Sequence, residues 1–239
     1  MLESAGQRRK PTIWRSPVAW ARRKLALTID DAVGAMGYKP VKKIDFSDMT
    51  GEDFAHVIDV GVADGTPDLY ARFPNAYLDL FEPHPTYQQH LDETILRQRP
   101  GRLHKCGLGS RDGTATLFLK GRTGSTLAAD RGRGQIEVPV RRLDSVLKPD
   151  DIRHPCLLKI DTEGYELEVL RGATGIMEHI DCVVSEVHFT TPQMYRPREL
   201  FAYLEELGFE MSEMLDFHSG QGRVWCADFV FRRIPGRTT

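Results

Sequence analysis

A glycine-rich turn followed by an acidic residue is the first candidate for chemistry in this sequence. The apolar run 57–60 contains Asp59 and leads into a turn of small residues. The small residues are Gly61, Ala63 and Gly65. Glu82 closes the next apolar run, about 20 residues later, where a carboxylate can accept hydrogen bonds from both hydroxyls of a ribose. A strand, a small-residue turn and a helix start are typical of a nucleotide cradle.

The spacing of this turn distinguishes between cofactors. Dinucleotide enzymes use the pattern G-x-G-x-x-G, whose third glycine lies inside the helix. Here Asp59 precedes a G-x-A-x-G turn whose last glycine ends the turn. An acid at this position suits a cofactor with a free ammonium, such as S-adenosylmethionine. A strand-to-helix turn without any ligand is the alternative.

A second group of polar residues follows two later apolar runs. Asp161 and Glu163 end the run 157–164, and Glu186 and His188 end the run that begins at residue 181. Side chains alternate along a strand, so Glu186 and His188 share one side and can point into one cleft. Close carboxylates require a proton, a cation or a metal to hold them together. The alternative is structural, because acids are also favoured near helix starts.

The pattern of the chain explains how these residues are positioned. Short apolar runs alternate with helical patterns from residue 54 onward, which predicts a parallel sheet covered by helices on both faces. We expect seven strands in the main sheet, the last two forming an antiparallel hairpin. The predicted strands cover residues 56–60, 77–82, 102–106, 156–160, 181–187, 209–215 and 223–232. An insertion at 113–147 is predicted to form a hairpin around a Gly- and Arg-rich loop.

Composition limits the classes of protein. At 239 residues, the chain is long enough for one main domain, and its net charge of −2 gives no reason to expect nucleic acid. Residues 1–50 are basic, and residues 16–36 within them predict an amphipathic helix. This helix suits a domain edge or a homodimer interface, or alternatively a membrane surface or an acidic partner.

The cysteines and apolar runs indicate the cellular setting. The four cysteines are far apart and lie in or beside apolar runs, which predicts buried, reduced thiols. No apolar run approaches the roughly 18 residues of a membrane span, and we expect a cytoplasmic protein, with peripheral membrane attachment through the N-terminal helix as the alternative.

The motifs together resemble one family. The segments V-I-D-V-G-V-A-D-G-T, F-E-P-H-P, K-I-D-T-E-G-Y-E and V-V-S-E-V-H-F resemble the FkbM-type methyltransferases, from residue 54 to about 190. The resemblance implies a Rossmann-like, seven-stranded fold in residues 51–239, an α/β domain that binds S-adenosylmethionine. It also implies O-methylation of a hydroxyl on a sugar, glycoconjugate or natural product.

The resemblance assigns roles to individual positions. The cofactor-binding residues would be Asp59, Gly61, Gly65, Glu82, Gly107, Leu108 and Asp161. Of these, Gly107 and Leu108 would flank the adenine, and Asp161 would lie near the sulfonium. Glu163, Glu186 and His188 would face the acceptor.

Two mechanisms remain open at this point. In the first, His188 acts as general base and is oriented by Glu186 or Asp161. In the second, Asp161, Glu163 and Glu186 hold Mg²⁺, which lowers the pKa of a bound hydroxyl.

Rival functions are open as well. A non-catalytic protein that keeps the cofactor fold and docks through its basic N-terminal helix is the main alternative. An oxidoreductase is disfavoured by the turn spacing, and a nucleic-acid methyltransferase by the absence of an Asn-Pro-Pro-Tyr or Asp-Pro-Pro-Tyr motif.

Overall fold

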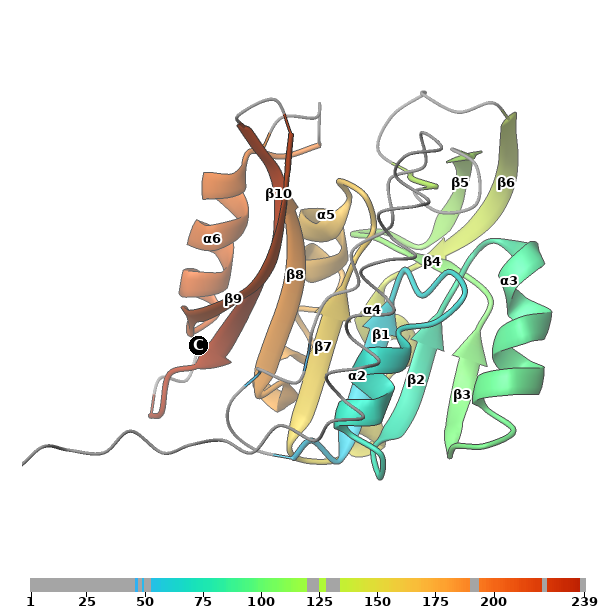
Figure 1. Cartoon of the computed structure of the whole chain (residues 1–239), viewed down its shortest axis with the longest axis horizontal. Coiled ribbons are helices and arrows are strands. Elements are labelled where there is room, and N and C mark those ends of the chain that lie inside the picture. Colours follow the sequence, from blue (N-terminus) through green and yellow to red (C-terminus); the bar gives the residue numbers. More distant parts are fainter. Residues whose placement is uncertain are drawn as a thin grey trace, which may run out of the picture. The chain divides into compact units, whose positions relative to one another are not determined.

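A seven-stranded sheet forms the centre of the structure (Figure 1). The computed structural model describes residues 46, 49, 53–119, 125–127, 134–189, 194–220 and 223–236. The strand order is β3-β2-β1-β7-β8-β10-β9. The strands are β1 (His56–Val60), β2 (Tyr77–Phe81), β3 (Gly101–His104), β7 (Cys156–Ile160), β8 (Cys182–His188), β9 (Phe209–Gly220) and β10 (Arg223–Arg233).

The central strands are parallel, and only the hairpin departs from that direction. β1 pairs in parallel with β2 and β7, and β7 pairs in parallel with β8, whereas β10 runs antiparallel to both β8 and β9. Every residue of β1 and of β7 is buried. Burial on both faces explains why these two strands are apolar except at His56, Asp59 and Lys159, each of which has a polar partner. The parallel arrangement brings the carboxyl ends of β1, β7 and β8 to one edge.

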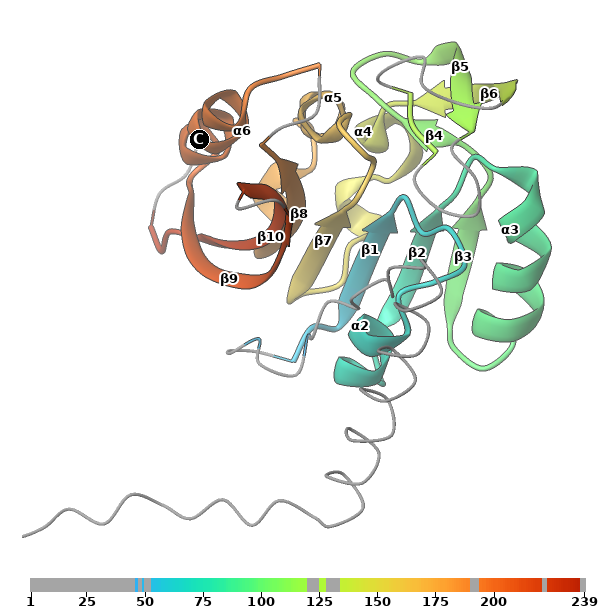
Figure 2. The ribbon, with the colours of Figure 1, turned by 45° about the horizontal axis from the view of Figure 1, so that its top comes forward.

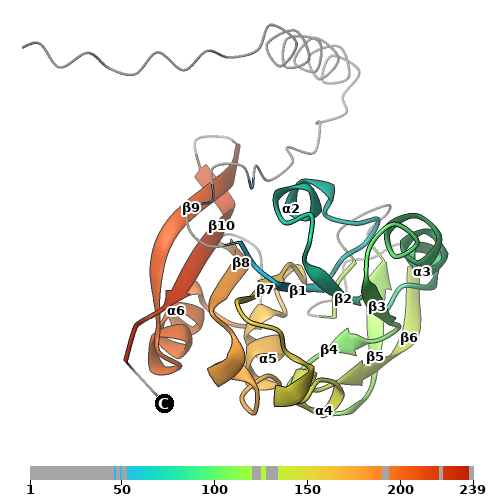
Figure 3. The same ribbon diagram turned by 90° about the horizontal axis from the view of Figure 1, so that it is seen from below.

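Helices cover both faces of the sheet. α2 (Pro67–Arg72) and α3 (Pro85–His90), which continues into a π-helical turn at Leu91–Ile95, contribute to the apolar cluster on one face. The opposite face packs against α4 (Leu143–Val146), α5 (Glu166–Arg171) and α6 (Pro197–Glu206). Figure 3, viewed from below, shows α2 on one side of the sheet and these three helices on the other. Short 3₁₀ turns at Pro149–Asp151 and Met177–His179 complete the described helical segments.

A second, three-stranded sheet stands beyond the carboxyl ends of β1 and β2 (Figure 2). It consists of β4 (Gly107–Leu108), β5 (Gly113–Leu119) and β6 (Gly134–Arg141), in the order β4-β6-β5. β5 and β6 form the antiparallel hairpin of the insertion, and β4 pairs in parallel with β6. The insertion is therefore anchored to the main domain next to the third strand of the large sheet.

The sequence predictions for the sheet are confirmed in large part. Strands 56–60 and 156–160 match β1 and β7 residue for residue, and the predicted antiparallel hairpin is β9 and β10, of which β9 extends to Gly220. All four cysteines are free and buried, as expected. The short β4 was not predicted. The predicted helix at 16–36 lies outside the described residues, so the domain boundary near residue 50 stays a prediction.

None of the described helices is both long enough and apolar enough to cross a membrane.

One buried charge network ties the first three strands together. Asp79 on β2 is fully buried and contacts His56, His104 and Arg102 at 2.7 to 3.0 Å. Burial alone would raise the pKa of Asp79, but the hydrogen bonds from His104, His56 and Arg102 outweigh it and hold this pKa well below its usual range. The carboxylate is thus charged and paired in the folded protein.

Replacing Asp79 with Asn should destabilise the protein by about 3 kcal/mol at neutral pH, because the half-exposed Arg102 would lose its counter-charge and His56 and His104 would lose a buried carboxylate partner. The folded-state pKa of Asp79 is lowered, so its contribution is complete above the unfolded value of about 3.9 and is lost as the pH falls through the folded value. Urea unfolding of both proteins should therefore show a gap at pH 7 that narrows below about pH 4.

Asp53→Asn is the matched control, since Asp53 forms an exposed pair with Arg72 and should leave the unfolding midpoint almost unchanged. Equal effects of Asp53→Asn and Asp79→Asn would contradict the assignment of the Asp79 network.

Candidate active site

The turn after β1 approaches the end of β7 at the carboxyl edge of the sheet. Gly61 has a φ of +78°, and a Cβ at this residue would lie 1.8 Å from the carbonyl oxygen of Asp161. Only glycine tolerates both the left-handed backbone and this approach. Ala63 and Gly65 in the same turn also have positive φ values, of 50° and 110°. The small residues predicted from the sequence therefore bring the turn directly against the start of the second acidic group.

Glu82 closes this turn from the neighbouring strand. Its carboxylate accepts hydrogen bonds from the backbone N–H of Ala63 at 2.7 Å and of His84 at 2.6 Å. Burial raises the pKa of Glu82 more than these two N–H groups lower it. Each carboxylate oxygen still has acceptor capacity beyond these bonds. Glu82 thus lies beside the glycine turn, where the sequence predicted a ribose-binding acid.

Asp59 is buried and already bonded to other side chains, which is not what a carboxylate in direct contact with a ligand would show. Its side chain is fully buried, and one carboxylate oxygen accepts hydrogen bonds from the hydroxyls of Thr66 and Tyr70 at 2.8 and 2.7 Å. The other oxygen lies 3.3 Å from Nζ of Lys159. In this arrangement Asp59 fastens the start of α2 and the end of β7 to β1. A direct contact between Asp59 and a cofactor ammonium stays a prediction.

Lys159 is a site residue that the sequence reasoning missed. Its ammonium lies 3.3 Å from both Asp59 and Asp161, and its side chain is 3% exposed. Burial alone would lower the pKa of Lys159, but the charges of Asp59 and Asp161 raise it above its ordinary value. The signal in the sequence was a lysine inside the apolar run 157–160, since a buried lysine requires a paired acid.

The predicted acidic group and His188 do converge. Asp161, Glu163 and Glu186 each offer one oxygen within 4.8 Å of the others. Nε2 of His188 lies 2.7 Å from Glu186 and 3.9 Å from Glu163. Glu186 and His188 are mostly buried, whereas Asp161 and Glu163 are 30% and 31% exposed. A ligand can therefore reach this cluster through Asp161 and Glu163.

The cluster changes the proton affinities of its members. Burial alone would lower the pKa of His188, but the contact with Glu186 and the charges of nearby glutamates raise it to about 9. Burial, together with the charges of Glu186, Glu163 and Glu166, raises the pKa of Asp161 to about 7, although Lys159 opposes this. The imidazole of His188 is thus protonated at neutral pH.

A strand distant in the sequence completes the cluster. Cys226 and Asp228 on β10 lie opposite His188 and Glu186 on β8. The thiol of Cys226 donates to Glu186 at 3.2 Å. Burial, followed by the charges of Glu186 and Asp161, raises the pKa of Asp228 well above its ordinary value. Neither residue was predicted, because the sequence near Cys226 and Asp228 does not show that they pair with β8.

The predicted adenine-flanking residues lie in β4. Gly107 and Leu108 are both buried, and a Cβ at Gly107 would lie 3.2 Å from a side-chain carbon of Leu127 and 3.8 Å from Pro83. Pro83 directly follows Glu82 in the chain, so β4 lies close to the end of β2. An adenine contact at Gly107 and Leu108 stays a prediction.

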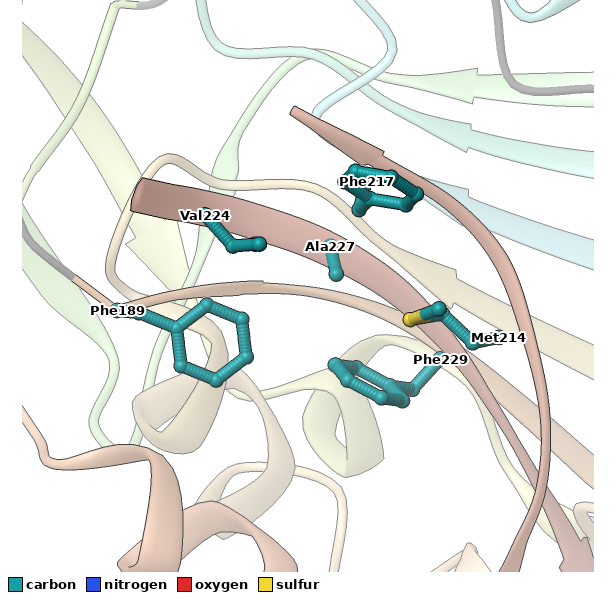
Figure 4. Close-up of a pocket in the computed structure, with 6 residues that line it drawn as sticks. All are labelled: Phe189, Met214, Phe217, Val224, Ala227 and Phe229. Atoms are coloured by element: carbon teal, nitrogen blue, oxygen red, sulfur yellow. The ribbon is translucent and has the colours of Figure 1, made fainter. Parts of the chain in front are cut away.

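An apolar pocket of about 450 Å³ lies beside β8, β9 and β10, away from the acidic cluster (Figure 4). It is lined by Phe189, Met214, Phe217, Val224, Ala227 and Phe229. Side-chain alternation places Phe189 and Ala227 on the sheet face opposite Glu186 and His188. The pocket therefore does not belong to the acidic cluster.

The strand order, in which β10 alone of the strands beside β8 runs antiparallel to it, is that of a Rossmann-like fold of the S-adenosylmethionine-dependent methyltransferase type. In such folds ligands bind at the carboxyl ends of the parallel strands. A family model for the methyltransferase FkbM domain matches residues 59–211. The chain therefore belongs to the FkbM methyltransferase family. This membership supports methyl transfer from S-adenosylmethionine as its activity.

Curated relatives share part of the sequence. Methyltransferase sdnD of Sordaria araneosa is 30% identical over 65% of this chain and 74% of its own length. Methyltransferase 1 of Beauveria bassiana is 28% identical over 55% of this chain, which spans 62% of that relative. The hexuronic acid methyltransferase AglP of Haloferax volcanii is 27% identical over 45% of this chain, which spans 46% of AglP.

Solved structures are similar at low sequence identity. Magnesium protoporphyrin IX methyltransferase from Synechocystis PCC 6803 is 8% identical, with a TM-score of 0.45 over 91% of this chain and 82% of that chain. A TehB-like methyltransferase from Corynebacterium glutamicum is 10% identical, with a TM-score of 0.44 over 90% of this chain and 99% of that chain.

Replacing Gly61 with Ala should weaken S-adenosylmethionine binding at least about tenfold, because the new Cβ must push the turn away from Asp161 and strain the backbone. Calorimetric titration measures this change. Gly113→Ala is the control, since a Cβ at Gly113 meets no atom within 4 Å. An unchanged affinity in the Gly61 variant would show that the close approach does not shape the cofactor site.

Proposed function

We propose that the protein is an O-methyltransferase that acts on a hydroxyl of a sugar, glycoconjugate or natural product. The observation that carries the proposal is the position of His188, Glu186, Asp161 and Glu163 directly beyond the glycine turn. Gly61 lies against the backbone of Asp161, so a donor held by the turn has its neighbours among these residues. Such adjacency is what an in-line transfer between two bound molecules requires.

The residues of the turn fit S-adenosylmethionine. Gly61 and Ala63 have left-handed backbone and carry no side chain larger than a methyl group, and Glu82 offers its carboxylate beside them. We assign Glu82 to the ribose, Gly61 and Gly65 to the methionine part, and Gly107 and Leu108 to the adenine. When bound, S-adenosylmethionine supplies an electrophilic methyl group to the nucleophile.

The role of the acidic cluster is to orient the acceptor and to remove its proton. A hydroxyl becomes a competent nucleophile as a base takes its proton. His188 is our candidate for this base, and Glu186, 2.7 Å away, fixes its ring and stabilises the imidazolium that forms. Asp161 and Glu163 are the exposed members, which suits contact with the acceptor.

The raised pKa of His188 gives this proposal a distinctive pH dependence. A base works in its deprotonated form, so kcat/KM should rise with pH and level off above about 9. Glu186→Gln removes the neighbouring charge and should move the midpoint down toward the ordinary value of about 6.5. His188→Ala should lower kcat about 100-fold while the affinity for S-adenosylmethionine changes little.

The measurement is a pH series with an acceptor that the protein methylates, found in a panel of hexuronic acids, neutral sugars and hydroxylated natural products. Hexuronic acids belong in the panel because the relative AglP is named for them. A wild-type midpoint near 7 instead of near 9 would assign the base to Asp161. Cofactor binding without transfer to any acceptor would favour the non-catalytic alternative.

One observation favours a second mechanism. The three carboxylates within 4.8 Å match the hard oxygen ligands that Mg²⁺ prefers, and such an ion would lower the pKa of a bound hydroxyl. Against it, Lys159 already supplies positive charge at Asp161 and His188 supplies it at Glu186. Activity that survives exhaustive chelation supports the base mechanism, and loss that added Mg²⁺ restores supports the metal.

A further inference from the structure

The backbone that carries Glu163 has an unfavourable conformation. Glu163 has a φ of 56° and the following Gly164 a φ of 107°. Left-handed backbone is unfavourable for a residue with a side chain, so the surroundings must hold it in place. The peptide unit between Glu163 and Gly164 therefore needs contacts that fix its orientation.

The N–H side of this peptide is held by Glu166. The carboxylate of Glu166 is fully buried, and its Oε1 accepts hydrogen bonds from the backbone N–H of Gly164 at 2.9 Å and of Thr162 at 3.1 Å. Its other oxygen accepts from the hydroxyl of Tyr195 at 2.6 Å. The acid that opens α5 is therefore an internal clamp on the turn.

The carbonyl side of the same peptide is held by Thr126. Its Oγ1 donates to the carbonyl oxygen of Glu163 at 3.0 Å, and the carbonyl oxygen of Thr162 lies 3.4 Å away. Thr126 is 2% exposed, and its backbone N–H and C=O pair with those of Phe118 on β5 at 3.0 and 2.9 Å. A hydroxyl from the insertion thus reaches the acceptor side of the site.

The residue after Thr126 makes a second contact with the predicted cofactor region. A side-chain carbon of Leu127 packs closely over Gly107, which we assign to the adenine. Residues 125–127 therefore connect the proposed cofactor end of the site with the turn that carries Glu163.

We propose that Thr126 is a positioning residue for methyl transfer. It fixes the peptide plane between Glu163 and Gly164, together with Glu166, and so directs the Glu163 carboxylate toward the acceptor and His188. The insertion is then a working part of the active site. This inference rests on the proposed function for its catalytic consequence, but the clamp on the turn can be tested by itself.

The test compares Thr126→Val with Thr126→Ser in the full chain. Valine keeps the shape of threonine and removes the hydroxyl, whereas serine keeps the hydroxyl. With the acceptor identified by the panel, Thr126→Val should lower kcat about tenfold, as expected for the loss of one buried hydrogen bond at the reacting geometry. Its affinity for S-adenosylmethionine should change less than about twofold, and Thr126→Ser should stay within about threefold of the wild-type kcat.

Hydrogen exchange of the Gly164 amide is the second readout. It should be at least about fivefold faster in Thr126→Val than in the wild type, and close to wild type in Thr126→Ser. Unchanged exchange in Thr126→Val, equal loss of kcat in both variants, or faster exchange with normal kcat would each overturn the proposal. If the wild type methylates no acceptor, the proposed function fails, and the exchange comparison still decides whether Thr126 fixes the turn.

Discussion

The ion pair network around Lys159 is the interaction on which the site depends. This lysine lies between Asp59 on β1 and Asp161 at the end of β7, and it is almost completely buried. Without it, the fully buried carboxylate of Asp59 would lose its counter-charge, at a cost of several kcal/mol, and would face the partly exposed Asp161 on the neighbouring strand. Asp59 in turn holds Thr66 and Tyr70, and with them the start of α2. One ammonium therefore links the glycine turn to the acidic cluster.

The same network explains the electrostatics of the acceptor side. Lys159 and His188 are the cations that the described residues place among the carboxylates of Asp161, Glu163, Glu186 and Asp228. Burial and the negative charge that remains raise the pKa of Asp161, and the contact with Glu186 and that same charge raise the pKa of His188 although burial opposes this. With its pKa raised in this way, His188 holds a proton at neutral pH and can accept one from an acceptor only after it has lost its own. The proposed base mechanism is therefore favoured by high pH.

The sequence predicted the sheet and the convergence of the candidate site residues because both are encoded locally. β1 and β7 are short apolar runs bounded by glycine or acids, and the polar residues at their ends had to meet at one edge. The features that the sequence did not predict depend on contacts between residues far apart in the chain. β4 has two residues and exists because β6, some 30 residues later, pairs with it. Glu166 opens α5, where acids are ordinary, and its buried carboxylate accepts hydrogen bonds from Thr162, Gly164 and Tyr195 that no local pattern indicates. The proton affinity of His188 likewise depends on side chains from several strands.

In the proposed enzyme the glycine turn, Glu82 and the acidic cluster form one receptacle for donor and acceptor. The decisive measurement is a crystal structure with bound S-adenosylhomocysteine. We expect the ribose hydroxyls on Glu82, the homocysteine part against Gly61, and the sulfur atom facing Asp161, Glu186 and His188. A coproduct bound away from Glu82, or with its sulfur directed away from these three residues, would refute the shared receptacle.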